Sequence, residues 1–194
     1  AARIPDRNVA GFLRGSDPRL ADEWVVIGGH HDHLGRFKGE GDRQYLTGLK
    51  LGGERTLVLI DRSASMLHEE IVNIVRRRYL PEAEQLRSVK WRQAVASVDW
   101  LTAQFRPGSQ FQMYMFNNTV EPVIQGSDGV WLQADDATQL DEAVRVLRRT
   151  VPKNGTNMKA AFEVVSRLTP RPDNIILLVD GLPTMESAET SKRF

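Results

Sequence analysis

The chain has 194 residues, with 26 basic and 25 acidic side chains, so its net charge is +1. Hydrophobic residues make up 41% and charged residues 26%, a balance that suits a globular protein and argues against disorder. The near-neutral charge removes the main argument for a nucleic-acid or membrane-surface partner. No apolar run is long enough for a transmembrane segment. Because the chain has no cysteine, disulfides, thiolate zinc sites and cysteine nucleophiles are excluded.

A glycine-rich segment from Gly35 to Gly53 separates two parts of different composition, as a connector does. Before it, residues 9–13 and 24–27 predict two short strands joined by a turn. We therefore predict an N-terminal segment with a small β structure, residues 1–48, followed by a larger domain, residues 49–194.

The larger domain begins with a strand that is apolar throughout. Residues 56–60 end in Asp61, and such a continuous apolar run is typical of a parallel strand buried on both faces. A helical stretch follows to about Tyr79, Pro81 interrupts it, and a second helix runs over about residues 89–105 with apolar side chains at helical spacing.

Strands and helices continue to alternate along the rest of the chain. Residues 110–116 and 120–124 predict neighbouring strands, residues 140–151 and 158–168 predict helices, and residues 175–179 predict a second fully apolar strand. This alternation predicts an α/β fold, with an open, mostly parallel, Rossmann-like sheet flanked by helices.

The two apolar strands end in Asp61 and Asp180, and ligands bind at the carboxyl ends of strands in open α/β sheets. Ser63 and Ser65 alternate with Asp61, so their hydroxyls face the same side. Thr156 lies in a loop expected at the same edge. Two carboxylates close together repel each other unless a cation lies between them. Hydroxyl and carboxylate oxygens are hard donors, which suit Mg²⁺ or Mn²⁺.

These residues resemble the metal-ion-dependent adhesion site (MIDAS) of the von Willebrand factor type A domain. The family pattern is D-x-S-x-S, a distant threonine, and a strand-end aspartate followed by glycine. All five positions are filled in order, by Asp61, Ser63, Ser65, Thr156 and Asp180. The resemblance implies that the three hydroxyls hold Mg²⁺ or Mn²⁺, with the two aspartates acting directly or through water. It also implies an open metal position that captures an Asp or Glu of a protein partner.

A purely structural explanation exists for two members of this set, because Ser65 and Thr156 could each be only a helix N-cap. That explanation does not account for the two strand-end aspartates.

Two departures from the family pattern carry expectations of their own. About twenty residues, 67–86, stand between the serines and the regular helix, and this insertion carries Arg76-Arg77-Arg78, which could shape partner choice or form a solvated helix face. The chain also ends soon after the Asp180 strand. Unless the last residues or the N-terminal segment substitute for the family's last strands, this strand has an unpaired edge. We then predict marginal stability or dependence on a partner.

Three of the four histidines lie in the N-terminal segment, in His30-His31-Asp32-His33. Residues 4–45 resemble the start of the M28 zinc aminopeptidases, where a strand ends in His-x-Asp followed by His-Leu-Gly. By this resemblance His30 would be a Zn²⁺ ligand and Asp32 its orienting carboxylate. Catalytic zinc needs at least three protein ligands, and the later motifs of the family are not recognisable. We therefore expect an inactive remnant rather than an active peptidase.

The sequence thus favours a metal-dependent protein-binding module over the alternative, a zinc-dependent aminopeptidase. It leaves the compartment open, with a leaning toward an extracytoplasmic one because both resembled families are often found there.

Overall fold

The computed structural model describes residues 24–29 and 53–180, the first of these ranges as backbone only. In chain order the elements are β1 (Trp24–Gly29), β2 (Arg55–Asp61), the 3-10 helix η2 (Ala64–Leu67), α1 (Ile71–Arg77), α2 (Glu82–Gln85), α3 (Val89–Thr102), β3 (Gln110–Phe116), β4 (Val120–Pro122), β5 (Leu132–Gln133), α4 (Ala137–Arg149), α5 (Met158–Glu163), the 3-10 helix η3 (Val164–Arg167) and β6 (Asn174–Val179).

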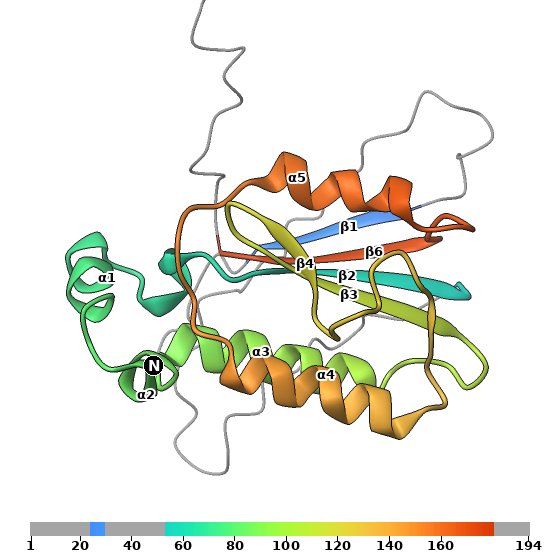
Figure 1. Cartoon of the computed structure of the whole chain (residues 1–194), viewed down its shortest axis with the longest axis horizontal. Coiled ribbons are helices and arrows are strands. Elements are labelled where there is room, and N and C mark those ends of the chain that lie inside the picture. Colours follow the sequence, from blue (N-terminus) through green and yellow to red (C-terminus); the bar gives the residue numbers. More distant parts are fainter. Residues whose placement is uncertain (1–23, 30–52, 181–194) are drawn as a thin grey trace, which may run out of the picture.

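The strands form an open sheet in the order β1-β6-β2-β3-β4, with β5 also paired to β3. The pairs β1/β6, β6/β2 and β2/β3 are parallel, and β4 and β5 run antiparallel to β3. Helices α3 and α4 cover one face of the sheet and α5 covers the other (Figure 1). The predicted α/β fold with an open, mostly parallel sheet flanked by helices is confirmed.

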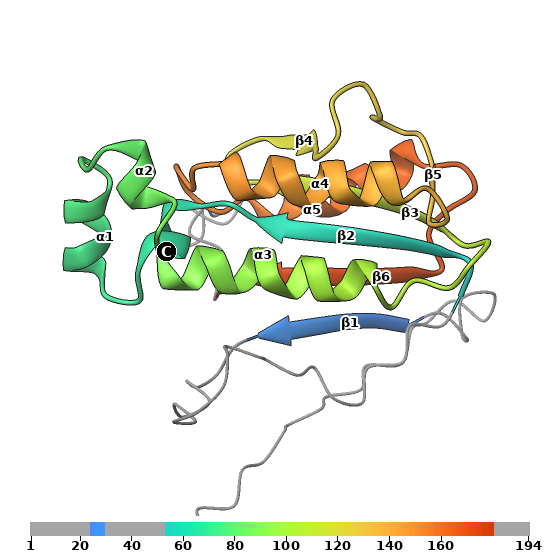
Figure 2. The same cartoon turned by 90° about the horizontal axis from the view of Figure 1, so that it is seen from below.

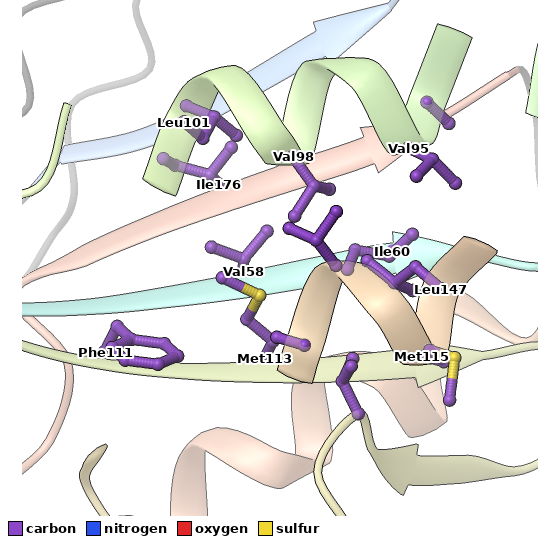
Figure 3. Packing of buried hydrophobic residues seen from close by; sticks show 14 of the residues in the cluster. Val58, Ile60, Val95, Val98, Leu101, Phe111, Met113, Met115, Leu147 and Ile176 are labelled. Atoms are coloured by element: carbon purple, nitrogen blue, oxygen red, sulfur yellow. The ribbon is translucent and has the colours of Figure 1, made fainter. Parts of the chain in front are cut away.

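One hydrophobic core lies between the sheet and the α3/α4 layer. Val58 and Ile60 of β2 point into it, beside Met113 of the neighbouring strand, and meet Val98 and Leu147 from the two helices (Figure 3). All of these side chains are almost completely buried. Burial of these apolar surfaces is the main force that holds the helical layer on the sheet.

A second core lies on the opposite face, against α5. Leu57 and Leu59, which alternate with the β2 residues of the first core, pack there with Tyr114 and Ala161. Successive side chains of a strand point to opposite faces, so a strand covered on both sides must be apolar at every position. The prediction for residues 56–60 is therefore confirmed.

The predicted insertion forms the short helices α1 and α2, which project beyond the end of the sheet (Figure 1). No residue of α1 is buried. Most of the large exposed apolar side chains in residues 53–180 lie here: Ile71, Val72, Val75, Tyr79 and Leu80. Val89, at the start of α3, and Val130 lie outside the insertion.

Strand β6, which precedes Asp180, has a neighbour on each edge. On one side it pairs with β2, and on the other it pairs with β1, from Trp24 opposite Asn174 to Gly29 opposite Val179. The N-terminal segment therefore provides the neighbouring strand (Figure 2), which is the exception under which the sequence predicted no unpaired edge. The expectation of marginal stability loses the reason given for it.

The boundaries of several elements differ from the predictions for identifiable reasons. Helix α4 ends at Arg149, because Val151 precedes Pro152 and that position disfavours helical backbone. The helix predicted over residues 158–168 divides into α5 and η3. There the hydroxyl of Ser166 donates to the carbonyl of Glu163 and so competes with regular helical bonds.

Some predictions fall outside what can be checked in the structure. The strand at residues 9–13 lies outside the described residues, and the division of the chain after residue 48 stays a prediction. Within residues 24–29 and 53–180, no helix is both long and apolar enough to cross a membrane.

Candidate metal centre

The parallel pairing of β2 with β6 brings two aspartates to one rim of the sheet. Ile60 lies opposite Leu178, so Asp61 at the end of β2 and Asp180 just after β6 leave the sheet at the same edge. This edge is the carboxyl end of the parallel strands, where open α/β sheets bind their ligands.

Asp61 is the innermost member of the cluster, with none of its surface exposed. Its Oδ1 accepts a hydrogen bond of 2.7 Å from the backbone N–H of Ser63, and its Oδ2 accepts one of 3.3 Å from the hydroxyl of Thr156. Both donors are neutral. No lysine or arginine within residues 53–180 forms an ion pair with this carboxylate.

The two serines connect Asp61 to Asp180. The hydroxyl oxygens of Ser63 and Ser65 are 2.7 Å apart, and the Ser65 hydroxyl donates to Oδ1 of Asp180 over 3.0 Å. All five residues predicted from the sequence therefore lie in one continuous chain of hydrogen bonds, although they come from three distant parts of the sequence.

Burial raises the pKa of Asp61 from its ordinary value of 3.8 to about 6, because the charged form loses its hydration. The hydrogen bonds from Ser63 oppose this effect, the negative charge of Asp180 adds to it, and the hydrogen bond from Thr156 again opposes it. Asp61 is thus an anion with little compensation, and a cation bound beside it would favour its ionised form.

Two loops hold the cluster in place through backbone hydrogen bonds. Ala64 N–H donates to the carbonyl of Asn154, and Lys153 N–H donates to the carbonyl of Arg62, over 2.9 and 2.8 Å. These bonds join the serine loop to the loop that carries Thr156. Asn154 has a φ of +69°, a left-handed conformation that asparagine tolerates better than most residues.

Asn117 supports the same loops and was not identified from the sequence. Its side chain donates to the carbonyl of Lys153 and accepts from Thr119 N–H, while its backbone carbonyl accepts from Asn157 N–H. The available signal was its position, because Asn117 directly follows the buried strand β3 at the edge of the sheet that also carries Asp61.

Lys90 is a second residue that sequence reasoning missed. Its Nζ lies 2.6 Å from Oδ2 of Asp180 and donates to the carbonyl of Ser65 over 3.2 Å. This lysine comes from the first turn of α3, which begins beside η2 (Figure 2). Nothing in the local sequence pattern marks it, because its partner is far away along the chain.

The donor set fits a hard divalent cation. Two carboxylates and three hydroxyls provide only oxygen atoms, which Mg²⁺ and Mn²⁺ prefer. Within the described ranges, no group of three or more histidine, cysteine, aspartate or glutamate side chains could hold a metal ion. His30 and Asp32 lie outside the described residues, so a second metal site there and the M28 resemblance stay predictions.

Comparison with known protein families decides the family of the chain. The model of the von Willebrand factor type A domain matches residues 56–182. The chain belongs to this family. The matched residues run from the start of β2 to just beyond Asp180, so the type A domain contains both strand ends of the candidate centre.

Solved structures agree with this assignment at the level of the fold. A von Willebrand factor type A protein from Catenulispora acidiphila has a TM-score of 0.53 and 20% sequence identity, and the match covers 70% of this chain and 28% of that one. The type A domain therefore spans well under half the length of that relative.

Two further structures are more distant. Protein BatB from Bacteroides thetaiotaomicron has a TM-score of 0.43 and 16% identity over 64% of this chain and 52% of its own. Proximal thread matrix protein 1 from the mussel byssus, described with a zinc-occupied MIDAS motif, has a TM-score of 0.43 and 17% identity over 68% and 32%. Among curated proteins, none matches the sequence significantly.

Proposed function

We propose that this type A domain is a metal-dependent protein-binding module. It holds Mg²⁺ or Mn²⁺ at a MIDAS and captures an acidic group of a protein partner; the residues of this site are Asp61, Ser63, Ser65, Thr156 and Asp180. The observation that carries the proposal is the continuous hydrogen-bond chain that joins these residues at the rim of the sheet.

Solvent exposure increases from one end of the cluster to the other. Asp61, Ser63 and Thr156 are buried, whereas Ser65 and Asp180 are partly exposed. A cation held mainly by neutral hydroxyls stays electron-poor, so it supplies a favourable contact for an incoming carboxylate. The partly exposed end of the cluster is where such a carboxylate can approach.

The surface beside the cluster supports a protein as the partner. Helix α1 of the insertion packs against η2, the helix that contains Ser65, and the insertion exposes 78% of Ile71 and 86% of Tyr79. Contiguous exposed apolar side chains rimmed by polar residues are typical of protein-interaction surfaces. A partner that reaches the open end of the cluster would also meet this surface.

Isothermal titration with Mg²⁺ and Mn²⁺ tests metal binding directly. The wild-type protein should release or absorb heat at millimolar metal or below, and Ser63→Ala should lose this signal. Ser166→Ala is the matched control, because its hydroxyl bonds only a local carbonyl far from the cluster. Equal heats for the two serine variants, or no heat for the wild type, would contradict the proposal.

Water-proton relaxation of bound Mn²⁺ tests carboxylate capture. If a coordination position is open to water, relaxation enhancement should appear on binding and should fall when a short aspartate-containing peptide is added. The same peptide with asparagine in place of aspartate is the control. An identical response to the two peptides would show that the site does not select an acidic group.

A further inference from the structure

Lys90 lies within reach of the open end of the candidate centre, where the proposed function places no positively charged side chain. Its Nζ is 2.6 Å from Oδ2 of Asp180, while the Ser65 hydroxyl occupies Oδ1 of the same carboxylate over 3.0 Å. Both oxygens of Asp180 therefore have partners within the protein. The ion pair is largely shielded, since the side chains of Lys90 and Asp180 are 24% and 10% exposed.

The position of Lys90 in its helix is unfavourable by itself. It is the second residue of α3, whose first turn contains no acidic side chain. Helix N-termini carry a partial positive charge and disfavour a cation there. The ammonium is compensated instead from outside the helix, by Asp180 and by the carbonyl of Ser65.

We propose that Lys90 is a tethered counter-ion of the candidate metal centre, which holds Asp180 while the site is free of metal and competes with the divalent cation for this carboxylate. The inference rests on the proposed function and adds a regulation of the same site. A metal ion that binds Asp180, directly or through water, must displace the ammonium of Lys90 or share the carboxylate with it. Metal affinity is then lower than the oxygen donors alone would give.

Two consequences of opposite sign follow from removing the charge. Lys90→Met leaves Asp180 without its cation, so the metal-free protein should melt several degrees lower in EDTA. The same change removes a positive charge close to the bound ion, so Mg²⁺ and Mn²⁺ should bind about tenfold more tightly. A merely structural lysine would lower stability without tightening metal binding.

Melting in EDTA and isothermal titration of the full chain with Mg²⁺ and Mn²⁺ test the proposal. Lys90→Arg should retain both wild-type values, because it keeps the charge. Lys159→Met is the matched control: this exposed lysine in the first turn of α5 forms no ion pair within residues 53–180, and its loss should change affinity less than twofold. Metal binding by Lys90→Met that is equal to or weaker than that of the wild type would overturn the proposal.

The outcome also separates this proposal from the proposed function. If the wild type binds metal and Lys90→Met binds no more tightly, only the role of Lys90 fails. If neither protein binds metal, the metal-dependent function fails and the counter-ion role fails with it.

A measurement on the wild-type protein covers the case in which Lys90→Met does not fold. Acetylation of Lys90 by acetic anhydride, quantified by peptide mass spectrometry, should be several-fold faster with saturating Mn²⁺ than in EDTA. Lys159 should react at the same rate in both. An unchanged rate at Lys90 would overturn the proposal.

Discussion

Asp61 and Asp180 lie at the same rim of the sheet, in opposite electrostatic surroundings. Asp61 is completely buried and receives hydrogen bonds only from neutral donors, and its pKa is raised to about 6. Asp180 is partly exposed and paired with the ammonium of Lys90. The two aspartates thus differ in charge compensation, although both lie at the ends of parallel strands. Asp61 has no cation beside it, whereas Asp180 is paired with the ammonium of Lys90.

The segments around these two strand ends differ as well. The chain after β2 runs through η2 into an insertion that buries no residue of α1 and contributes little to the core. Strand β6 lies between β2 and β1, so its end is fixed by backbone pairing on both sides. The first strand end is followed by exposed surface, and the second is held within the sheet.

The largest effect is expected from the uncompensated carboxylate. Asp61→Asn keeps the shape of the side chain but removes its charge, so Mg²⁺ affinity should fall by about 100-fold or more. Isothermal titration measures this loss. Asp141→Asn, at an exposed position of α4, is the control and should bind metal as the wild type does. Retained affinity in Asp61→Asn would remove Asp61 from the site.

The raised pKa of Asp61 predicts a pH dependence of stability. In the metal-free protein, the folded state holds the proton up to about pH 6, whereas the unfolded chain releases it near 3.8. The contribution of Asp61 to the free energy of unfolding is therefore complete below about pH 4, declines between about pH 4 and 6, and is absent above about pH 6. The total decline is at most about 3 kcal/mol.

To isolate this contribution, the free energy of unfolding in EDTA is measured at several pH values for the wild type and for Asp61→Asn. The difference between the two proteins is then followed against pH. The difference should move in favour of the asparagine variant as the pH rises from about 4 to 6. Metal affinity of the wild type should rise over the same range, because protons compete with the metal for Asp61. A difference that does not change with pH would show that Asp61 is not perturbed.

Proline in β1 tests whether pairing with the N-terminal strand stabilises β6. In an edge strand, the N–H groups of adjacent residues point alternately toward and away from the neighbouring strand. One of the variants Val25→Pro and Val26→Pro should therefore lose about 2–3 kcal/mol more stability than the other. Denaturant unfolding measures both, and equal stabilities near the wild-type value would argue against the β1/β6 pairing.

A smaller effect is expected at the compensated carboxylate. Asp180→Asn leaves Lys90 without its anion, so the metal-free protein should lose about 1 kcal/mol of stability, opposite in sign to Asp61→Asn. The double variant Asp180→Asn with Lys90→Met should recover part of this loss in thermal unfolding. If both asparagine variants shift stability in the same direction, the contrast between the two strand ends is wrong.

The smallest effect on stability is expected in the insertion. Ile71→Ser should change the free energy of unfolding by less than about 0.5 kcal/mol and leave metal affinity unchanged, because the side chain is exposed. It should reduce binding of an apolar fluorescent dye, whereas Val130→Ser, which changes an exposed apolar residue away from the insertion, should reduce it less. A large loss of stability would mean that the insertion belongs to the core.

The sequence allowed much of the fold to be predicted, because its signals are local. Fully apolar runs marked β2 and β6 as central strands, and the residues directly after them marked the rim where five oxygen-bearing side chains meet. Since parallel strands end at the same edge, the clustering of these side chains could be predicted although they lie far apart in the sequence.

Other features depend on contacts that no local pattern contains. The sequence left open whether the N-terminal segment would pair with β6, because strand order is set by long-range packing. The ion pair of Lys90 could not be predicted, because its partner Asp180 lies near the other end of the domain in the sequence. Asn117 followed the pattern of an ordinary turn, and only the buried environment shows that its side chain connects two loops.

The pairing of β1 with β6 also has a consequence for folding. Trp24 lies opposite Asn174, so this edge of the sheet can form only after nearly the whole domain has been synthesised. Until then, β1 would leave the ribosome with unpaired backbone groups, a state in which strands are prone to associate with other chains. Contacts so distant in sequence carry a large loop-closure cost and slow folding. Among the described strands, β6 thus comes last in the sequence and pairs with β1, which comes first.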